Sequence, residues 1–303
     1  MQEPIILISG SNGLVGQYLH RALLHIPAKV IATGRESSRL GMEQEASAPE
    51  FVQWEITDPQ QVSAVLKTHR PNIIIHAAAE AQPDFCEQNR EAAWQTNVAA
   101  TRYIAEVAEE IGAFMLFVST DFVFKGDAGP YKETDLPDPV NYYGETKREA
   151  EQLVQQICTS WAIVRTVLVY GKTADGTRSN IITWLQGHLE KGNPIKVVND
   201  QVRTPTYAGD LAKGILAVAL KKAGGIWHIS GKDELTPYQM GLKVAERLNL
   251  PKELMTPVTA DTFTQPAVRP LKTGFDIYKA ENELGYAPIS FEEGINIMIR
   301  NLF

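Results

Sequence analysis

One stretch near the start of the chain, IILISGSNGLVG at residues 5–16, decides the fold. Its apolar part, Ile5–Ser9, predicts a strand buried on both faces, and a helix is expected to begin near Leu14. Glycines at positions 10, 13 and 16 let the backbone turn tightly and approach a pyrophosphate. The free N–H groups and positive dipole end of the helix would meet that group. The stretch therefore predicts a dinucleotide-binding turn, and the alternative is a tight strand–helix turn without a ligand.

The same alternation of apolar and amphipathic segments continues through the first half of the chain. Further strands are expected at residues 29–33, 51–54, 72–76, 114–119 and 161–165. Helices are expected after the Asp58-Pro59 pair, where Asp can cap and Pro suits the first turn, and over residues 87–111 and 142–158. Strands and helices in this order predict right-handed crossovers. The fold class is therefore α/β, with a Rossmann-type, doubly wound parallel sheet.

After Tyr170 the pattern changes, which indicates a second, smaller lobe. Helices are expected over residues 180–190, 206–220, 236–248 and 277–284, short strands at 195–198 and 225–230, and a loop over 255–273. The strand at 225–230 can return to the main sheet. We therefore expect residues 1–170, joined by 206–232, to form an NAD(P)-binding Rossmann domain. Residues 171–205 and 233–303 are expected to form a C-terminal α/β substrate-binding lobe.

Bulk properties are those of an ordinary globular protein. The 303 residues are 44% hydrophobic and 21% charged, with a net charge of -7, so nothing favours nucleic acid or an anionic membrane as a partner. No apolar run reaches the ~20 residues that a membrane-spanning helix needs. Cys86 and Cys158 stand outside any metal-ligand spacing, and no metal site is predicted. Two cysteines and no cleavable signal favour the cytoplasm.

The ends of the next strands predict the rest of the cofactor site. NAD-selective folds usually have an acidic residue at the end of the second strand, where this chain has Gly34 and Arg35. The fork of an arginine can pair with a 2′-phosphate, so NADP(H) is expected in preference to NAD(H), unless Arg35 is an ordinary solvated loop residue. Glu55 and Ile56 follow the third strand, and the small Ala77–Ala79 triplet follows the fourth.

A catalytic pair is predicted at the start of the helix over residues 142–158. Tyr143 and Lys147 are four residues apart and share one helix face. An ammonium beside a phenol should lower the pKa of the phenol, which would make Tyr143 a proton donor to a carbonyl oxygen. Thr120, at the end of a buried strand, can hydrogen-bond the same oxygen. Such a pair also occurs by chance on surface helices, and its position after the glycine turn and Thr120 gives it weight. The expected cofactor contacts are Gly10, Asn12, Gly13, Leu14, Val15, Gly16, Arg35, Glu55, Ile56, Ala77, Ala78, Ala79, Tyr143 and Lys147.

Taken together, these segments resemble the extended short-chain dehydrogenase/reductase superfamily, and within it the dTDP-4-dehydrorhamnose reductase family. The resemblance spans nearly the whole chain and rests on Gly10–Gly16, Ala77–Ala79, Ser119–Phe124, Tyr143–Lys147 and Arg269-Pro270. It implies that Thr120, Tyr143 and Lys147 are catalytic and that NAD(P)H donates a hydride. It also implies reduction of a nucleotide-linked 4-keto-6-deoxy sugar, as in dTDP-rhamnose biosynthesis.

The substrate is expected between the Tyr143 helix and the second lobe. An arginine suits a diphosphate because its fork pairs two oxygens at once, although both candidate arginines can also be plain surface charges. The expected substrate contacts are Thr120, Asp121, Leu168, Asn180, Arg203 and Arg269. The resemblance places Arg269 in a loop of the substrate lobe.

Departures from the family pattern keep the sugar and the activity open. Val167-Leu168 stands where the family often has Ser-Trp, and Glu80-Ala81 where it commonly has His-Thr. The same scaffold also serves epimerases and dehydratases, which usually need further acid or base residues. A third reading is a cofactor-binding regulatory subunit like that of methionine adenosyltransferase, which resembles the same reductases. Whether the chain forms a homodimer is also open.

Overall fold

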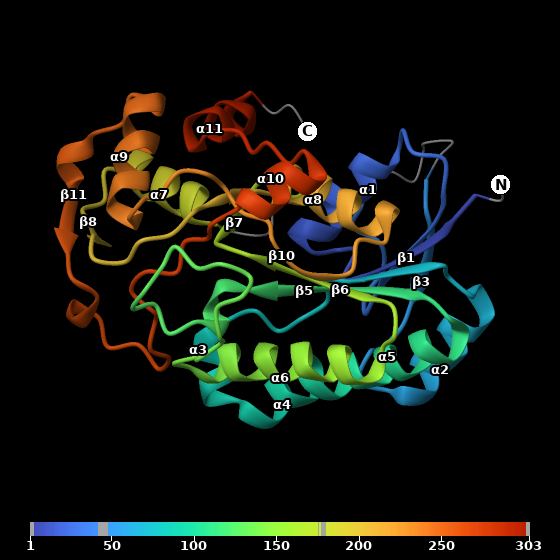
Figure 1. Ribbon diagram of the computed structural model, residues 1–303. Helices are drawn as coiled ribbons and strands as arrows, with labels where there is room; N and C mark the ends of the chain where they lie inside the picture. Colours follow the sequence, from blue (N-terminus) through green and yellow to red (C-terminus); the bar gives the residue numbers. More distant parts are fainter. Residues whose placement is uncertain (1–2, 42–47, 175, 177–179, 301–303) are drawn as a thin grey trace.

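The computed structural model describes residues 3–41, 48–174, 176 and 180–300 (Figure 1). Seven parallel strands form the central sheet in the order β10-β6-β5-β4-β1-β2-β3. The strands of this sheet are β1 (Ile5–Ser9), β2 (Lys29–Gly34), β3 (Glu50–Gln53), β4 (Ile73–His76), β5 (Phe114–Thr120), β6 (Trp161–Thr166) and β10 (Gly225–His228). The chain order reverses direction beside β1, which makes the sheet doubly wound and confirms the predicted fold class.

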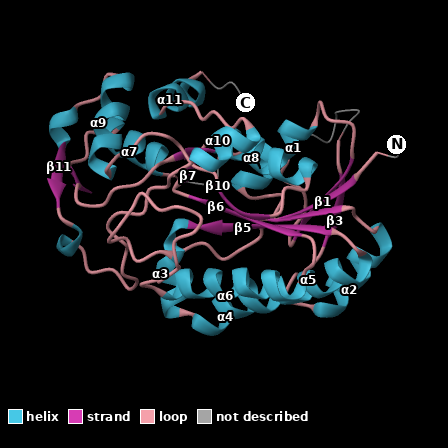
Figure 2. Ribbon diagram, in the orientation of Figure 1, coloured by secondary structure: helices cyan, strands magenta, loops and turns pink. Residues whose placement is uncertain are grey.

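Both faces of the sheet are covered by helices. Along β1, Ile6 and Ile8 pack into one core and Leu7 into the other, and all three side chains are fully buried. The first core is closed by α1 (Leu14–Leu23), α8 (Ala208–Lys221) and α10 (Tyr278–Leu284). The second is closed by α2 (Pro59–His69), α5 (Ala100–Ile111) and α6 (Tyr142–Ile157). Figure 2 shows the two helical layers on opposite sides of the strands.

A third apolar core lies in the second lobe, at the left of Figure 1. It contains side chains from α7 (Ile181–Glu190), β8 (Ile195–Val198), α9 (Pro237–Leu248), β11 (Met255–Val258) and α11 (Phe291–Ile299). Strand β11 pairs in parallel with β8, and β7 (Val169–Tyr170) pairs with β9 (Thr206–Tyr207). As expected, the segment after α8 returns to the main sheet, where β10 pairs with β6. The exact division into two domains stays a prediction.

Two expectations about elements were wrong, and one helix was missed. The helix expected over residues 87–111 is divided into α3 (Pro83–Gln88), α4 (Arg90–Trp94), a π-helical turn η1 (Gln95–Ala99) and α5. The break falls at Asn89, whose φ of -130° and ψ of 59° are not helical. The loop expected over 255–273 contains β11 and the short turn η4 (Ala260–Thr262). Helix α11 was not predicted, although Ser290 and Glu293 form a capping box at its start.

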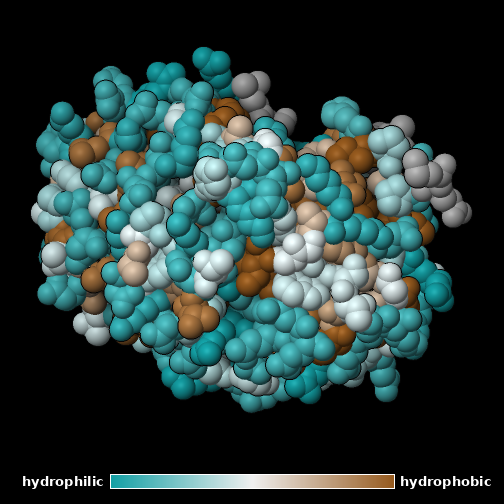
Figure 3. All heavy atoms as spheres, viewed as in Figure 1, coloured by the Kyte–Doolittle hydropathy of each residue, from teal (hydrophilic) through white to brown (hydrophobic). Residues whose placement is uncertain are grey.

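Two further short turns complete the described elements, η2 (Asp121–Val123) and η3 (Lys252–Leu254). The face seen in Figure 3 is largely hydrophilic, with apolar side chains scattered over it. No helix in the described ranges combines the length and apolar character needed to cross a bilayer.

Candidate active site

One large cavity lies at the carboxyl-terminal edge of the sheet. Its volume is ≈ 980 Å³, and its wall includes the residues that end or follow β1 to β6. Ligands of doubly wound folds bind at this edge. Every residue predicted for the cofactor or the substrate lines it, namely Gly10, Asn12, Gly13, Leu14, Val15, Gly16, Arg35, Glu55, Ile56, Ala77, Ala78, Ala79, Thr120, Asp121, Tyr143, Lys147, Leu168, Asn180, Arg203 and Arg269.

The cavity also has lining residues that were not predicted. They are Gly34, Glu36, Arg39, Trp54, Glu80, Ala81, Gln82, Pro83, Thr96, Val118, Ser119, Phe122, Thr166, Val169, Ile181, Gln201 and Pro237. Most are neighbours of predicted residues, and chain proximity alone could have found them. Thr96 and Pro237 lie far from any predicted residue in the chain, and Arg39 lies in a loop that the Asn12 side chain holds in place. Asn12 accepts a hydrogen bond from the Arg39 N–H at 2.8 Å and donates one to the Ser37 carbonyl at 2.9 Å.

The glycine turn is held against the end of β4. Gly10 has a φ of +76°, and a Cβ at this position would lie 2.8 Å from the backbone of Ala78. Both the conformation and the close approach therefore require glycine. Gly13 is the N-cap of α1 and provides no side-chain cap, so the first N–H groups of this ten-residue helix have no capping side chain. Gly13 to Gly16, at this end of the helix, line the cavity.

These features fit the diphosphate of a nicotinamide dinucleotide. An uncapped helix N-terminus attracts a phosphate through its N–H groups and its dipole. The small side chains of Ala77–Ala79 leave room beside it, and Arg35 lines the same cavity at the end of β2. If a dinucleotide binds here, Gly13–Gly16 would hold its diphosphate and Arg35 would lie near its adenosine.

Helix α6 brings the catalytic candidates together. Asn141 caps the helix by accepting a hydrogen bond from the Gly144 N–H at 2.9 Å. Tyr143 and Lys147 are 9% and 2% exposed, and the Tyr143 hydroxyl forms a hydrogen bond with Thr120 at the end of β5. The Lys147 ammonium donates to the Val118 carbonyl at 2.8 Å. Tyr143 and Thr120 are therefore hydrogen-bonded to each other in the cavity wall, and Lys147 lines the same cavity.

Asn97 supports this arrangement from the π-helical turn η1. Its side chain donates hydrogen bonds to the Thr146 hydroxyl on α6 and to the Glu80 carbonyl, both at 3.0 Å, and accepts one from the Glu80 N–H at 2.8 Å. It thus links α6 to the loop after β4. His76, in contrast, is packed as expected: its ring is fully buried and hydrogen-bonded to Ser9 and Thr101.

The expected lowering of the Tyr143 pKa was wrong for this fold. Burial raises the pKa of Tyr143 above its usual value, and the hydrogen bond with Thr120 opposes this only in part. The ammonium of Lys147 is directed to the Val118 carbonyl and lies 3.9 Å from the centre of the Phe117 ring. Burial lowers the pKa of Lys147 to about 7, and Glu151 opposes that shift. Tyr143 is accordingly protonated at neutral pH.

Asp121 and Arg203 are bound to other parts of the protein. Asp121 is 3% exposed and accepts hydrogen bonds from Thr120 and Thr273. The Arg203 guanidinium lies 3.7 Å from Asp121 and donates to the carbonyls of Val202, Pro270 and Leu271. Burial raises the pKa of Asp121, and the Arg203 charge opposes that rise. Both residues line the cavity, but these contacts hold its wall together.

The remaining substrate candidates also have partners. Asn180 caps α7 by accepting hydrogen bonds from the N–H groups of Ile182 and Thr183. Arg269 forms a two-pronged ion pair with Asp84 on α3, and its hydrogen bond holds the pKa of Asp84 below its usual range. Leu168 has a left-handed φ of 37°, which is uncommon for a residue with a side chain.

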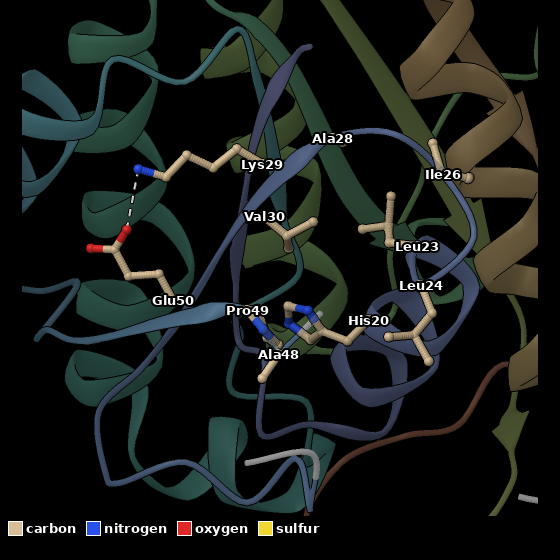
Figure 4. A pocket seen from close by; sticks show the side chains of 10 residues that line it. All are labelled: His20, Leu23, Leu24, Ile26, Ala28, Lys29, Val30, Ala48, Pro49 and Glu50. Atoms are coloured by element: carbon tan, nitrogen blue, oxygen red, sulfur yellow. Dashed lines mark ion pairs between the residues drawn. The ribbon is translucent and has the colours of Figure 1, made fainter. Parts of the chain in front are cut away.

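A second, smaller pocket lies at the opposite end of α1. It has a volume of ≈ 330 Å³, and Figure 4 shows His20 extending from α1 toward Ala48 and Pro49 across it. Burial lowers the pKa of His20 to about 4. None of the predicted functional residues lines this pocket. Within the described ranges, no group of three or more His, Cys, Asp or Glu side chains is arranged to hold a metal ion.

Comparison with known protein families shows to which family the chain belongs. The family described as RmlD substrate binding domain matches residues 4–303. The chain belongs to the RmlD family. A family member's fold was expected from the glycine turn and the Tyr143–Lys147 pair, and that expectation is confirmed. Among solved structures, dTDP-4-dehydrorhamnose reductase from Bacillus anthracis in complex with NADP superposes with a TM-score of 0.86 and 27% identity, covering 99% of this chain and 100% of that one.

Other relatives of this RmlD family member differ in what their names describe. A dTDP-4-dehydrorhamnose reductase from Clostridium acetobutylicum has a TM-score of 0.86 and 30% identity, covering 98% of this chain and 99% of that one. Methionine adenosyltransferase 2 subunit beta from Pongo abelii is 30% identical over 281 residues, 91% of this chain and 81% of that protein. A reductase solved with NADP and a subunit of another enzyme are thus both similar to this chain.

Proposed function

We propose that this chain is an NAD(P)H-dependent reductase of a nucleotide-linked 4-keto-6-deoxy sugar. The observation that carries the proposal is the meeting of Thr120, Tyr143 and Lys147 in the cavity beside the uncapped start of α1. A proton donor and a diphosphate site within one cavity are what reduction of a carbonyl by a dinucleotide requires. The named reductases of the same family support the substrate class.

In this mechanism a bound dihydronicotinamide would supply the hydride, and residues of the chain itself would supply the proton. Thr120 and Tyr143 hold the carbonyl oxygen of the sugar. As the carbon accepts the hydride, the oxygen becomes basic and takes the proton of the Tyr143 hydroxyl. Because burial raises the pKa of Tyr143, the phenol carries that proton at neutral pH. In its protonated form, Lys147 would stabilise the phenolate, and it would also hold the nicotinamide ribose.

For the nucleotide diphosphate, Arg269 is the better of the two candidate arginines. Its fork pairs with Asp84, a partly exposed carboxylate next to the cavity-lining Pro83, and a diphosphate can compete for it. Arg203 donates to three backbone carbonyls and is 4% exposed, so releasing it would leave buried groups unpaired. We assign Arg203 to holding the wall, together with Asp121, and place the sugar between Thr120, Leu168 and Asn180.

The test is oxidation of NADPH by the purified chain with dTDP-4-dehydrorhamnose, followed by its absorbance. Turnover that disappears when the keto sugar is replaced by dTDP-glucose would support the proposal. A panel of 4-keto sugars on other nucleotides then defines the substrate. Binding of NADPH without turnover of any keto sugar in the panel would overturn the reductase assignment. Conversion of UDP-glucose with catalytic NAD would instead support an epimerase.

A second candidate is a regulatory subunit, favoured by the 30% identity to methionine adenosyltransferase 2 subunit beta. Such a subunit can keep the cofactor cavity while acting through a protein surface. The test is size-exclusion chromatography with a methionine adenosyltransferase catalytic chain, with and without NADPH. Co-elution together with a changed rate of the transferase would support this function. Separate elution under both conditions would exclude it for that partner.

A further inference from the structure

A buried ion pair lies one helical turn beyond the catalytic lysine. Glu151 follows Lys147 by four residues on α6, so the two side chains share a helix face. Glu151 is 1% exposed. Both of its oxygens accept hydrogen bonds from Arg165 on β6, from Nε at 2.9 Å and from Nη2 at 2.7 Å. The proposed chemistry does not use either residue.

Removing the two charges of this ion pair from water costs free energy, so the pair contributes little to the stability of the fold. Both side chains are 2% exposed, so two charges have been removed from water. The Nη1 group of Arg165 has no hydrogen-bond partner among the described residues. Its guanidinium otherwise lies over the Phe124 ring, 5.0 Å from the centre. Apolar residues of similar volume in place of a buried pair are often neutral or stabilising. The location of the pair therefore suggests a role other than stability.

The surroundings of Lys147 indicate that role. Its ammonium makes one hydrogen bond, to the Val118 carbonyl, and lies over the Phe117 ring. Burial lowers the pKa of Lys147 to about 7, and Glu151 is the first group that opposes the shift, followed by Cys86. The other titratable groups near Lys147 do little to oppose the lowering of its pKa. Burial raises the pKa of the Cys86 thiol to about 12, so this thiol is neutral.

Two further groups face Lys147 and are also uncharged. His76 on β4 has its pKa lowered to about 3, by burial first and then by the Lys147 charge. Tyr143 precedes Lys147 by one turn and stays protonated, because burial raises its pKa. Among the residues that the structure describes, Glu151 is therefore the neighbouring anion that can keep the ammonium charged. Arg165 donates hydrogen bonds to both carboxylate oxygens and so fixes the position of the negative charge of Glu151.

We infer that the Glu151–Arg165 pair is a positioning element of the active site, which keeps Lys147 charged beside Tyr143. This inference rests on the proposed role of Tyr143 and Lys147 in proton transfer. Without the carboxylate, the ammonium would lose its proton at a lower pH. The phenolate formed in each turnover would then lack its counter-charge under conditions where the parent protein still works.

The experiment compares variants of the full chain. Glu151→Gln removes the anion but leaves Arg165 unpaired, and this variant can fail to fold. The double variant Glu151→Leu with Arg165→Met removes both charges at similar volume and should fold. The control is Glu110→Gln on α5, which removes the carboxylate that pairs with Lys67 at 2.8 Å on the surface. Circular dichroism shows which variants are folded.

The main measurement is the titration of the Lys147 Nζ signal by NMR with ¹⁵N-labelled lysine, assigned with Lys147→Met. In the double variant we expect the midpoint to fall, because Glu151 raises the pKa of Lys147 and Arg165 is not among the groups that shift it. Because the positive charge of Arg165 is removed together with the carboxylate, the fall should be smaller than the roughly one pH unit that an isolated adjacent opposite charge gives. With the keto sugar and NADPH, the alkaline limb of the kcat profile should move to lower pH by the same amount. Glu110→Gln should change neither.

Each outcome decides a different point. An unchanged Lys147 midpoint in the folded double variant overturns the inference, whatever the activity. A lowered midpoint in a protein without reductase activity leaves the inference standing and removes the proposed function. A lowered midpoint with an unmoved alkaline limb would also overturn it, because the charge of Lys147 would then not limit turnover.

Discussion

At the scale of single residues, Tyr143 is the most direct test of the chemistry. In Tyr143→Phe the ring can keep its edge-to-face contact with Phe122, whose centre is 5.8 Å away, while the proton donor is lost. We expect kcat to fall by roughly 10²–10⁴-fold, because the proton is needed only in the transition state, and NADPH binding to stay unchanged. Steady-state kinetics and a fluorescence titration measure the two quantities.

The adjacent residue provides the control for this prediction. Tyr142 packs under the Arg90 guanidinium, 4.7 Å from its ring centre, and Tyr142→Phe preserves that contact. This variant should turn over like the parent protein. Equal kcat values for Tyr143→Phe and Tyr142→Phe would remove Tyr143 from the mechanism.

Cofactor choice is also decided by single side chains. Arg35 follows Gly34, and a Cβ at Gly34 would already lie 3.2 Å from the Asn12 amide, so an acidic side chain does not fit easily there. We expect NADPH to be preferred, and Arg35→Ala to weaken its binding by roughly ten- to a hundredfold while NADH binding is unaffected. The measurement is kcat/KM with each cofactor at low and high salt.

Arg39 is the comparison for Arg35. It lines the same cavity but pairs with Glu36, so Arg39→Ala should have the smaller effect on NADPH. Equal kcat/KM values for the two cofactors in the parent protein would refute the preference. A preference that survives Arg35→Ala would show that another residue carries it.

At the scale of elements, the contact between α6 and the turn η2 sets the active-site geometry. A Cβ at Gly144 would lie 2.1 Å from the Phe122 carbonyl oxygen, so Gly144→Ala must push the helix away. That movement would separate Tyr143 from Thr120. We expect a destabilisation of about 1–3 kcal/mol and a loss of kcat of roughly 10²-fold. Urea unfolding and steady-state kinetics measure the two effects.

Gly187 in α7 is the matched control. A Cβ there would meet nothing within 4 Å, so alanine can be added freely. Gly187→Ala should raise stability by about 0.5–1 kcal/mol through helix propensity and leave kcat unchanged. If the two alanine variants behaved alike, the tight packing of α6 on η2 would not matter for catalysis.

Elements with local signals could be predicted, and those that depend on distant partners could not. Asp58 caps α2 as its sequence indicates, with its carboxylate accepting from the N–H groups of Gln60 and Gln61. Strand β11 forms only because β8 is beside it, and its own sequence, MTPV, has no strand periodicity. The break at Asn89 lies inside an apparently continuous helical pattern, where no glycine or proline marks it.

At the scale of the whole molecule, the same limit applies to the site. All the predicted residues line one cavity, because parallel strands deliver their carboxyl ends to a common edge. Their partners could not be foreseen. Arg269 pairs with Asp84, 185 positions away, and Arg203 donates to the Pro270 carbonyl, 67 positions away. A residue type indicates what a side chain can bind, and only the folded chain determines which partner is present.

Three histidines buried without charge make the whole molecule sensitive to mild acid. Burial lowers the pKa of His20 to about 4 and that of His76 to about 3, and it also lowers the pKa of His228. In the unfolded chain each would titrate near ~6.5. Above that pH both states are neutral, and the full stability is present. Below that pH the histidines bind protons in the unfolded state but stay neutral in the folded state. The free energy of unfolding therefore falls as the pH drops toward 4.

The expected loss of stability is large for a change of 1.5 pH units. Between pH 6.5 and 5, His20 and His76 should each remove about 1.6 kcal/mol from the free energy of unfolding, and His228 should act in the same direction. The test is urea unfolding at both pH values for the parent, His20→Leu and, as control, His25→Leu at an exposed position. Both ring nitrogens of His20 lack partners among the described residues. Leucine at this position should therefore remove the contribution of His20 to the pH dependence of stability without breaking a hydrogen bond. His25→Leu should keep the parental difference between the two pH values, and a His20→Leu variant with that same difference would contradict the assignment.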